Sequence, residues 1–183
     1  MNQNRRNCIK LLVFSNITMS FVTNIWALDL SRKKKSTDRE LYIPATQKDR
    51  CPVCGMFVHP YPKWITQIQF RDGSHHSFDG MKCMCRFYLN PKKFDPTIKK
   101  EDIKRILVRD YYTLKFIRHD TAFYVIGGNV FGPMGQELIP FKNAKNAGIF
   151  LSDHNGLKTL RFNQINPELL DKLDKAKKTL NLE

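Results

Sequence analysis

The sequence predicts an α+β protein made of two small ββαβ halves, a C-terminal helix and an N-terminal signal or tether. Three observations support this fold class. An order of strand, strand, helix and strand occurs twice along the chain, with equivalent positions roughly fifty residues apart. An uncharged apolar run lies near the N-terminus, and a capped amphipathic segment lies near the C-terminus. The hydrophobic content of 42% and the aromatic content of 11% are those of a globular protein.

Residues 1–27 have the features of an export signal. Arg5, Arg6 and Lys10 precede a run without charge from Leu11 to Ala27. This run is diluted by polar residues and is short for a membrane span, so it suits a secretory signal cleaved near Ala27. Ile25 does not match the small residue expected before such a cut, which leaves an uncleaved anchor as the alternative.

Residues 28–50 are charged, lack hydrophobic periodicity and contain Pro44. This composition is typical of a mobile tether between the export signal and a folded part.

The first half is predicted over residues 51–112. Residues 64–70 alternate, with Gln67 and Gln69 on the face opposite the apolar side chains, which indicates a half-buried strand. A hairpin turn at residues 72–73 leads to a second strand over 75–78. A helix follows over 80–90 with Asp79 as its N-cap, and a third strand is expected over 105–112.

The second half is predicted over residues 113–163. Strands over 114–118 and 122–126 are expected to be joined by a short turn, and a glycine-rich loop over 127–135 separates them from a helix over 143–154 and a strand over 157–162. Residues 164–183 should form a last helix, begun by Asn166 and Pro167, with Leu169, Leu173, Ala176 and Leu180 on its apolar face.

The formal charge of +14 favours an acidic partner, an anionic lipid or a nucleic acid. The basic residues are spread along the chain, and no nucleic-acid motif accompanies them. We therefore expect solvated basic surface and no nucleic acid among the partners.

The motif that carries chemistry is Cys-Pro-Val-Cys-Gly-Met at Cys51 to Met56. A CxxC pair alone fits half of a zinc site, a redox pair or a structural disulfide. Met56 favours copper, because thiolate and thioether are soft donors that select Cu(I). The glycine-rich loop adds Met134, which that shaped backbone either displays as a further donor or buries as packing.

Taken together, the motifs resemble those of the NosL family. The resemblance includes CPVCGM at residues 51–56, FDG at 78–80, RDYYTL at 109–114, FYVIG at 123–127, GPMGQELIPF at 132–141 and LRF at 160–162. It implies a fold of two ββαβ halves making a cleft, related to part of the organomercurial lyases. It also implies an exported Cu(I) metallochaperone, not an enzyme, that serves nitrous oxide reductase biogenesis.

The resemblance carries a metal site over to Cys54, Met56 and Met134, with Cys51 matching the first motif cysteine. It implies apo nitrous oxide reductase as the partner, with a membrane copper exporter or other assembly factors beside it. The expected location is the periplasm, with membrane association through the N-terminus. Many relatives carry a lipobox cysteine after the apolar run, where this sequence reads Trp26-Ala27-Leu28.

Two other functions compete with copper transport. Cys51, Cys54, Cys83 and Cys85 have the ligand count of a structural zinc site, but residues two apart on a helix point to different sides, which separates Cys83 from Cys85. A thiol oxidoreductase would use Cys51 and Cys54 at a helix N-terminus, whereas here a proline-rich loop and a strand follow the motif.

Overall fold

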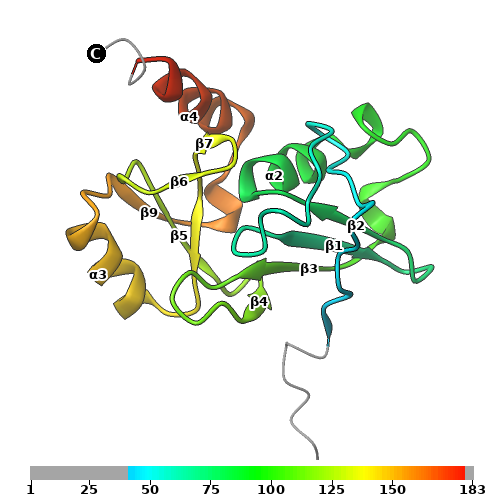
Figure 1. Ribbon diagram of the computed structural model, residues 1–183, viewed down its shortest axis with the longest axis horizontal. Helices are drawn as coiled ribbons and strands as arrows, with labels where there is room; N and C mark the ends of the chain where they lie inside the picture. The colour runs from blue at the N-terminus through cyan, green and yellow to red at the C-terminus, as the bar shows by residue number, and fades with distance from the viewer. Residues whose placement is uncertain (1–40, 180–183) are drawn as a thin grey trace, which may run out of the picture. The chain divides into compact units, whose positions relative to one another are not determined.

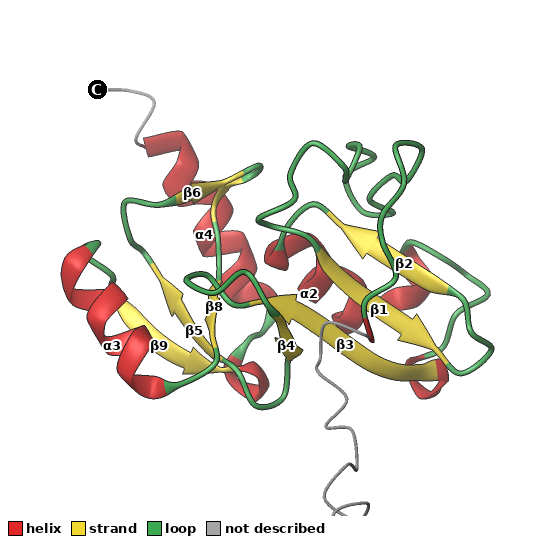
Figure 2. Cartoon of the chain, turned by 60° about the horizontal axis from the view of Figure 1, so that its bottom comes forward, coloured by secondary structure: helices red, strands yellow, loops and turns green. Residues whose placement is uncertain are grey.

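The computed structural model describes residues 41–179, with side chains through residue 176, and shows two main antiparallel sheets with a helix against each, besides a two-stranded hairpin (Figures 1 and 2). The strand orders are β2-β1-β3-β4 in the first sheet and β8-β5-β9 in the second. The sheets meet where β3 contacts β8. The predicted signal over 1–27 and the stretch 28–40 lie outside the described residues.

The first half consists of β1 (Thr66–Phe70), β2 (His75–Phe78), α2 (Met81–Leu89) and β3 (Ile103–Arg109). The central strand β1 pairs antiparallel with both β2 and β3, and α2 packs on β1 and β2. Two single 3-10 turns, Pro91–Lys93 and Lys100–Asp102, lead from the helix to β3.

The second half repeats this topology with β5 (Phe123–Ile126), β8 (Ile139–Phe141), α3 (Ala144–Asp153) and β9 (Lys158–Arg161). Its first strand, β5, is again central, between the second and the last strand. A hairpin of β6 (Phe131–Gly132) and β7 (Gly135–Gln136) is inserted between β5 and β8. The prediction of two ββαβ halves is confirmed.

The strand predicted to open the second half belongs to the first sheet instead. β4 (Phe116–Arg118) pairs with β3, where Val108 faces Ile117, and does not pair with β5. The burial of Phe116, which also stacks on Tyr42 at a ring distance of 4.0 Å, holds β4 there. The true partner of β5 is β8, a strand of three residues whose Pro140 faces Tyr124 and weakens its strand signal.

Residues 41–50, expected in the mobile tether, pack on the first sheet instead. Ile43 exchanges two hydrogen bonds with the Gln67 side chain, at 3.1 and 2.8 Å, and Gln69 Nε2 donates to the Leu41 carbonyl at 2.5 Å. Every residue of β1 is therefore buried, and the prediction of a half-buried strand is wrong. The two glutamines satisfy the backbone of a covering segment that is not itself a strand.

The last helix, α4 (Pro167–Thr179), begins as predicted, because Asn166 Oδ1 accepts from the Leu169 amide at 2.9 Å. It packs against α2 and β7 and buries Leu170 and Leu173, whereas Ala176, expected on the apolar face, is exposed. Leu180 lies outside the described residues. No helix in the described part of the chain is long and apolar enough to span a bilayer.

The main core is shared by the two halves. It joins Phe78 and Phe87 of the first half to Tyr124 and Leu160 of the second and to Leu173 of α4. A smaller cluster lies under α3, and its buried members are Val125, Ile139, Phe141, Ala147 and Phe150. A common core fixes the two halves against each other, so residues from both can contribute to one site.

Candidate metal centre

The CPVCGM motif forms a closed loop. The Cys51 amide donates to the Met56 carbonyl at 2.8 Å, and the Gly55 amide donates to the Cys51 carbonyl at 2.9 Å. Gly55 has a φ of +76°, a conformation that glycine adopts without steric cost. Arg50 and Phe57 close the loop as a β-bridge, and the Arg50 guanidinium stacks on the Phe57 ring at 3.8 Å. The loop thus turns both cysteines toward the start of α2.

Three thiols and one carboxylate converge beside this loop. One donor atom each from Cys51, Cys54, Cys83 and Asp79 lies within 4.8 Å of every other, and we call this group the thiol cluster. Cys51, Cys83 and Asp79 are buried, and Cys54 is half-buried. All four described cysteines are free thiols. The sequence pointed to Cys51 and Cys54, and the fold adds two donors from the β2–α2 junction.

The sequence predicted Asp79 as the N-cap of α2, and this prediction is wrong. The N-cap residue is Gly80, which makes no side-chain capping hydrogen bond. The Asp79 carboxylate instead accepts a hydrogen bond from the Cys54 thiol, with Sγ 3.4 Å from Oδ1. Its other oxygen is buried without a partner. A buried carboxylate oxygen without a hydrogen-bond partner needs an explanation, and its place beside three thiols makes it suitable for binding a cation.

The three thiols differ in their readiness to ionise. A hydrogen bond from the Cys83 thiol lowers the pKa of Cys51, against the opposing effect of burial. The same hydrogen bond and burial raise the pKa of Cys83 above its ordinary value. Burial raises the pKa of Cys54 to about 12. Cys51 is therefore the first thiolate of the cluster, while Cys54 stays protonated until a metal ion displaces its proton.

Cys85 takes no part in the cluster. It lies two residues after Cys83, faces the core and is fully buried, which raises its pKa. The helix argument against a zinc site using both residues is thus confirmed. A thiol oxidoreductase would place Cys51 and Cys54 at the N-terminus of a helix. Turns and a β-bridge follow the motif instead, as the sequence predicted.

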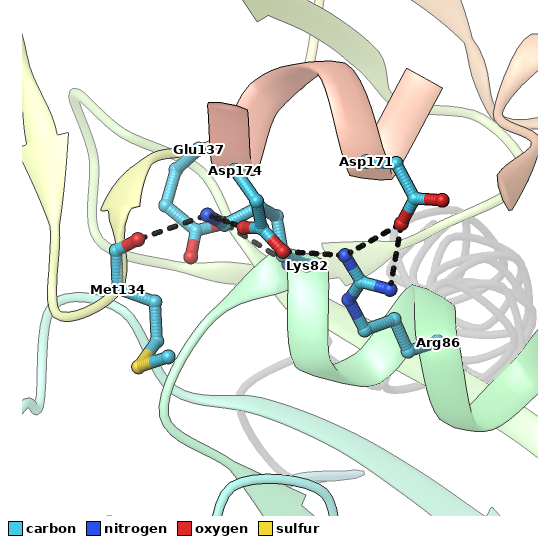
Figure 3. Close-up of polar contacts among 6 residues, drawn as sticks. All are labelled: Lys82, Arg86, Met134, Glu137, Asp171 and Asp174. Atoms are coloured by element: carbon cyan, nitrogen blue, oxygen red, sulfur yellow. Dashed lines mark hydrogen bonds and ion pairs between the residues drawn. The ribbon is translucent and has the colours of Figure 1, made fainter. Parts of the chain in front are cut away.

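The two methionines of the predicted site come from different halves. Met56 closes the CPVCGM loop through its carbonyl and is half-buried. Met134 lies in the turn of the β6–β7 hairpin and packs, like Cys54, against the main core. Its carbonyl accepts from Lys82 Nζ at 2.9 Å, and its thioether extends away from that ammonium (Figure 3). Met84, on α2, is fully buried in the core.

Glu137, directly after this hairpin, is a site residue that the sequence did not reveal. Its Oε2 accepts from the backbone amide of Lys82 at 2.9 Å, so a side chain of the second half caps the N-terminus of α2 in the first. The cap fits because Gly80 and Gly132 leave room: a Cβ there would lie 2.6 Å from Oε1 and 2.4 Å from Cγ. A glutamate with no local helix to cap gives no short-range signal of this role.

Burial raises the pKa of Glu137 to about 7, with the Lys82 amide and ammonium opposing the rise and Asp79 adding to it. The folded protein therefore holds a proton between about pH 4.5 and 7 that the unfolded chain has lost. Stability should fall across that window as pH rises, by about 3 kcal/mol at most, and stay level above it.

Glu137→Gln keeps an acceptor for the Lys82 amide and cannot ionise. Urea unfolding at several pH values should show its stability gain over the parent growing from pH 4.5 to 7, and parallel curves would contradict this.

The chain is similar to known proteins in sequence and in fold. A sequence model of the NosL family matches residues 42–170. A protein of Stutzerimonas stutzeri named copper-binding lipoprotein NosL is 28% identical over 124 residues, which are 67% of this chain and 64% of that relative.

Among solved structures, the copper chaperone NosL from Shewanella denitrificans matches with a TM-score of 0.59 at 22% sequence identity. The match covers 69% of this chain and 96% of that one. The structural match establishes the shared α+β fold, and the family match extends over the CPVCGM loop, the GPMG hairpin and most of the described residues. The chain therefore belongs to the NosL family.

Proposed function

We propose that this protein carries Cu(I) as cargo and delivers it for assembly of the copper centre of nitrous oxide reductase. The observation that carries the proposal is the convergence of three thiols, two of them from the CPVCGM motif, in a member of the NosL family. The names of the two relatives, a copper-binding lipoprotein and a copper chaperone, support copper as the cargo.

The donor chemistry favours Cu(I) held by Cys54, Met56 and Met134, with Cys51 as a further motif thiol. Cys83 adds another thiol, whose sulfur lies within 4.8 Å of the sulfurs of Cys51 and Cys54. Cu(I) accepts two or three soft donors, and thioethers allow an ion to leave more readily than a cage of thiolates does. Binding releases the proton of Cys54, whose thiol donates a hydrogen bond to Asp79 in the metal-free protein.

A carrier needs a partner and a place. We propose apo nitrous oxide reductase as the acceptor, with a membrane copper exporter or other assembly factors as the source. The location is the periplasm, where residues 1–27 direct the chain and where an uncleaved segment would anchor it to the inner membrane. The lipoprotein name of the relative supports export. The protein acts as a chaperone and not as an enzyme.

Met134→Leu tests the two-half site. Leucine keeps the volume and apolarity, so the fold should barely change, while Cu(I) affinity should fall about tenfold because one soft donor is lost. Anaerobic competition of the reduced protein with a chromophoric Cu(I) chelator measures this. Met84→Leu, buried in the core, is the matched control and should bind as the parent does. Equal affinity of Met134→Leu and parent would make Met134 a packing residue only.

Delivery is tested by mixing the Cu(I)-loaded protein with apo reductase, separating the two and measuring the copper content and activity of the reductase. Copper should move to the reductase faster than from a small-molecule Cu(I) complex of equal affinity. Transfer no faster than from that complex would leave a copper-binding protein without this delivery role.

A zinc site is the second candidate, because the thiol cluster offers three thiolates and a carboxylate, the four ligands of a closed tetrahedral site. Asp79 replaces Cys85 in the set expected from sequence. Metal analysis after expression with both metals present separates the two candidates: copper with one ion per chain supports the carrier, and tightly held zinc with no copper supports the structural site.

A further inference from the structure

We propose that Lys82 is a positioning residue of the metal site, which holds the Met134 hairpin in place through the Met134 backbone carbonyl. This inference rests on the proposed function, since it assumes that Met134 is a ligand. It assigns a role to the buried ammonium of Lys82, which is not one of the proposed Cu(I) ligands.

Lys82 is an unusual lysine. Only 2% of its side chain is exposed, and its ammonium lies 2.9 Å from the Met134 carbonyl oxygen and 2.6 Å from Asp174 Oδ1 of α4. Lysine is almost never this buried unless its charge is paired, because removal of an ammonium from water is costly. Figure 3 shows the ammonium between the hairpin and α4, with the Met134 carbonyl pointing to it. The position of the charge is thus fixed from two sides.

The strand pairing within the hairpin is short. β6 and β7 pair through two residue pairs only, Phe131 with Gln136 and Gly132 with Gly135, and Pro133 and Met134 form the turn. Pairing of this length is marginally stable by itself, so the hairpin depends on contacts with other elements. α4 packs against β7, the Gln136 side chain donates to the Gly128 carbonyl at 3.0 Å, and Lys82 donates to the turn. The hydrogen bond from Lys82 is made to the turn, at the backbone carbonyl of Met134 itself. It therefore restricts where the thioether can lie.

Lys82 also ties Met134 to the thiol cluster. It precedes Cys83 in the first turn of α2, and its own backbone amide is held by Glu137. The same turn of helix therefore places a cluster thiol and holds the hairpin that carries the thioether. Removing the ammonium should loosen the Met134 donor and leave the cysteines in place.

Arg86 provides a matched control one helical turn further along α2. Its guanidinium pairs with the same Asp174 at 2.6 Å and with Asp171 at 3.3 Å, and in the described part of the chain it forms no hydrogen bond with Met134 (Figure 3). Lys82→Leu and Arg86→Leu each remove one cation from the α2–α4 interface without adding a sulfur donor, and only the first removes the donor to the hairpin. The expected Cu(I) affinity is about tenfold weaker for Lys82→Leu, the scale of one charge-assisted hydrogen bond, and unchanged for Arg86→Leu.

A double variant shows whether Lys82 acts through Met134. In the Met134→Leu background the thioether is already gone, so adding Lys82→Leu should change Cu(I) affinity by less than about twofold. X-ray absorption of the Cu(I)-loaded Lys82→Leu protein should show one sulfur ligand fewer, as for Met134→Leu. Urea unfolding of each apo variant checks the fold, and Lys82→Gln replaces Lys82→Leu if the latter does not fold.

The outcomes separate this inference from the function on which it rests. If Met134→Leu binds Cu(I) as tightly as the parent, the two-half site fails first. If Met134→Leu weakens binding but Lys82→Leu does not, or if the two losses add in full, Lys82 does not position Met134. Equal losses from Lys82→Leu and Arg86→Leu would reduce Lys82 to a general support of the α2–α4 contact.

Discussion

Replacing Cys54 by serine should weaken Cu(I) binding by at least about a hundredfold, since even outer partners of metal ligands typically change affinity by 10- to 100-fold. Cys54 belongs both to the CPVCGM loop and to the thiol cluster, so every ligand set proposed above includes it. Serine offers a hard, neutral oxygen where Cu(I) prefers a soft thiolate. The hydroxyl can still donate to Asp79, so the apo fold should remain near the parent in stability.

Cys85→Ala is the control for this substitution. Cys85 is a cysteine of the same region, fully buried and outside the thiol cluster. Its replacement removes a sulfur from the core and should cost stability without changing Cu(I) affinity. Competition titration with a chromophoric chelator under reducing, anaerobic conditions measures both variants. Parent-like affinity of Cys54→Ser would exclude the CPVCGM loop as the Cu(I) site.

The repeated fold was predictable because its signals are local. Strand alternation, the Asp72-Gly73 turn and the Asn166 cap each depend on residues within a few positions of one another. The pairing partners were not predictable in this way. Strand β4 lies next to β5 in sequence, yet burial of Phe116 places it on the first sheet. Segment 41–50 is charged and aperiodic, yet it hydrogen-bonds to two glutamine side chains about 25 residues away.

The same distinction between local signals and long-range contacts applies to the candidate site. Cys51, Cys54 and Met56 were found because six adjacent residues contain them. Cys83 was considered only together with Cys85, as a zinc ligand, and residues two apart on a helix cannot both bind one ion. Asp79 was predicted to be a helix N-cap. Both assignments changed once β2 and α2 were placed against the CPVCGM loop. Glu137 acts across the two halves, on a helix amide 55 residues earlier in the chain, and no short-range pattern indicates such a contact.

Gly80→Ala should destabilise the fold by about 3 kcal/mol, combining the usual cost of overpacking with that of a disturbed helix cap. The backbone of Gly80 is extended, with φ of −168°, so alanine meets no conformational strain there. The obstacle is space. The new Cβ would lie 2.6 Å from Glu137 Oε1 and 3.1 Å from its Cδ. Glu137 is buried and bonded to the Lys82 amide at 2.9 Å, so it moves away only by giving up the cap of α2.

Gly148→Ala separates this steric effect from the general consequence of adding a methyl group. Gly148 lies on the exposed side of α3, and a Cβ there would have no atom within 4 Å. Alanine favours a helix over glycine by up to about 1 kcal/mol, so this variant should be slightly more stable than the parent. Urea midpoints of the two variants should therefore shift in opposite directions. If Gly80→Ala is as stable as the parent, Glu137 does not hold the position that links the GPMG hairpin to α2, and other residues must make the contact between the halves beside the thiol cluster.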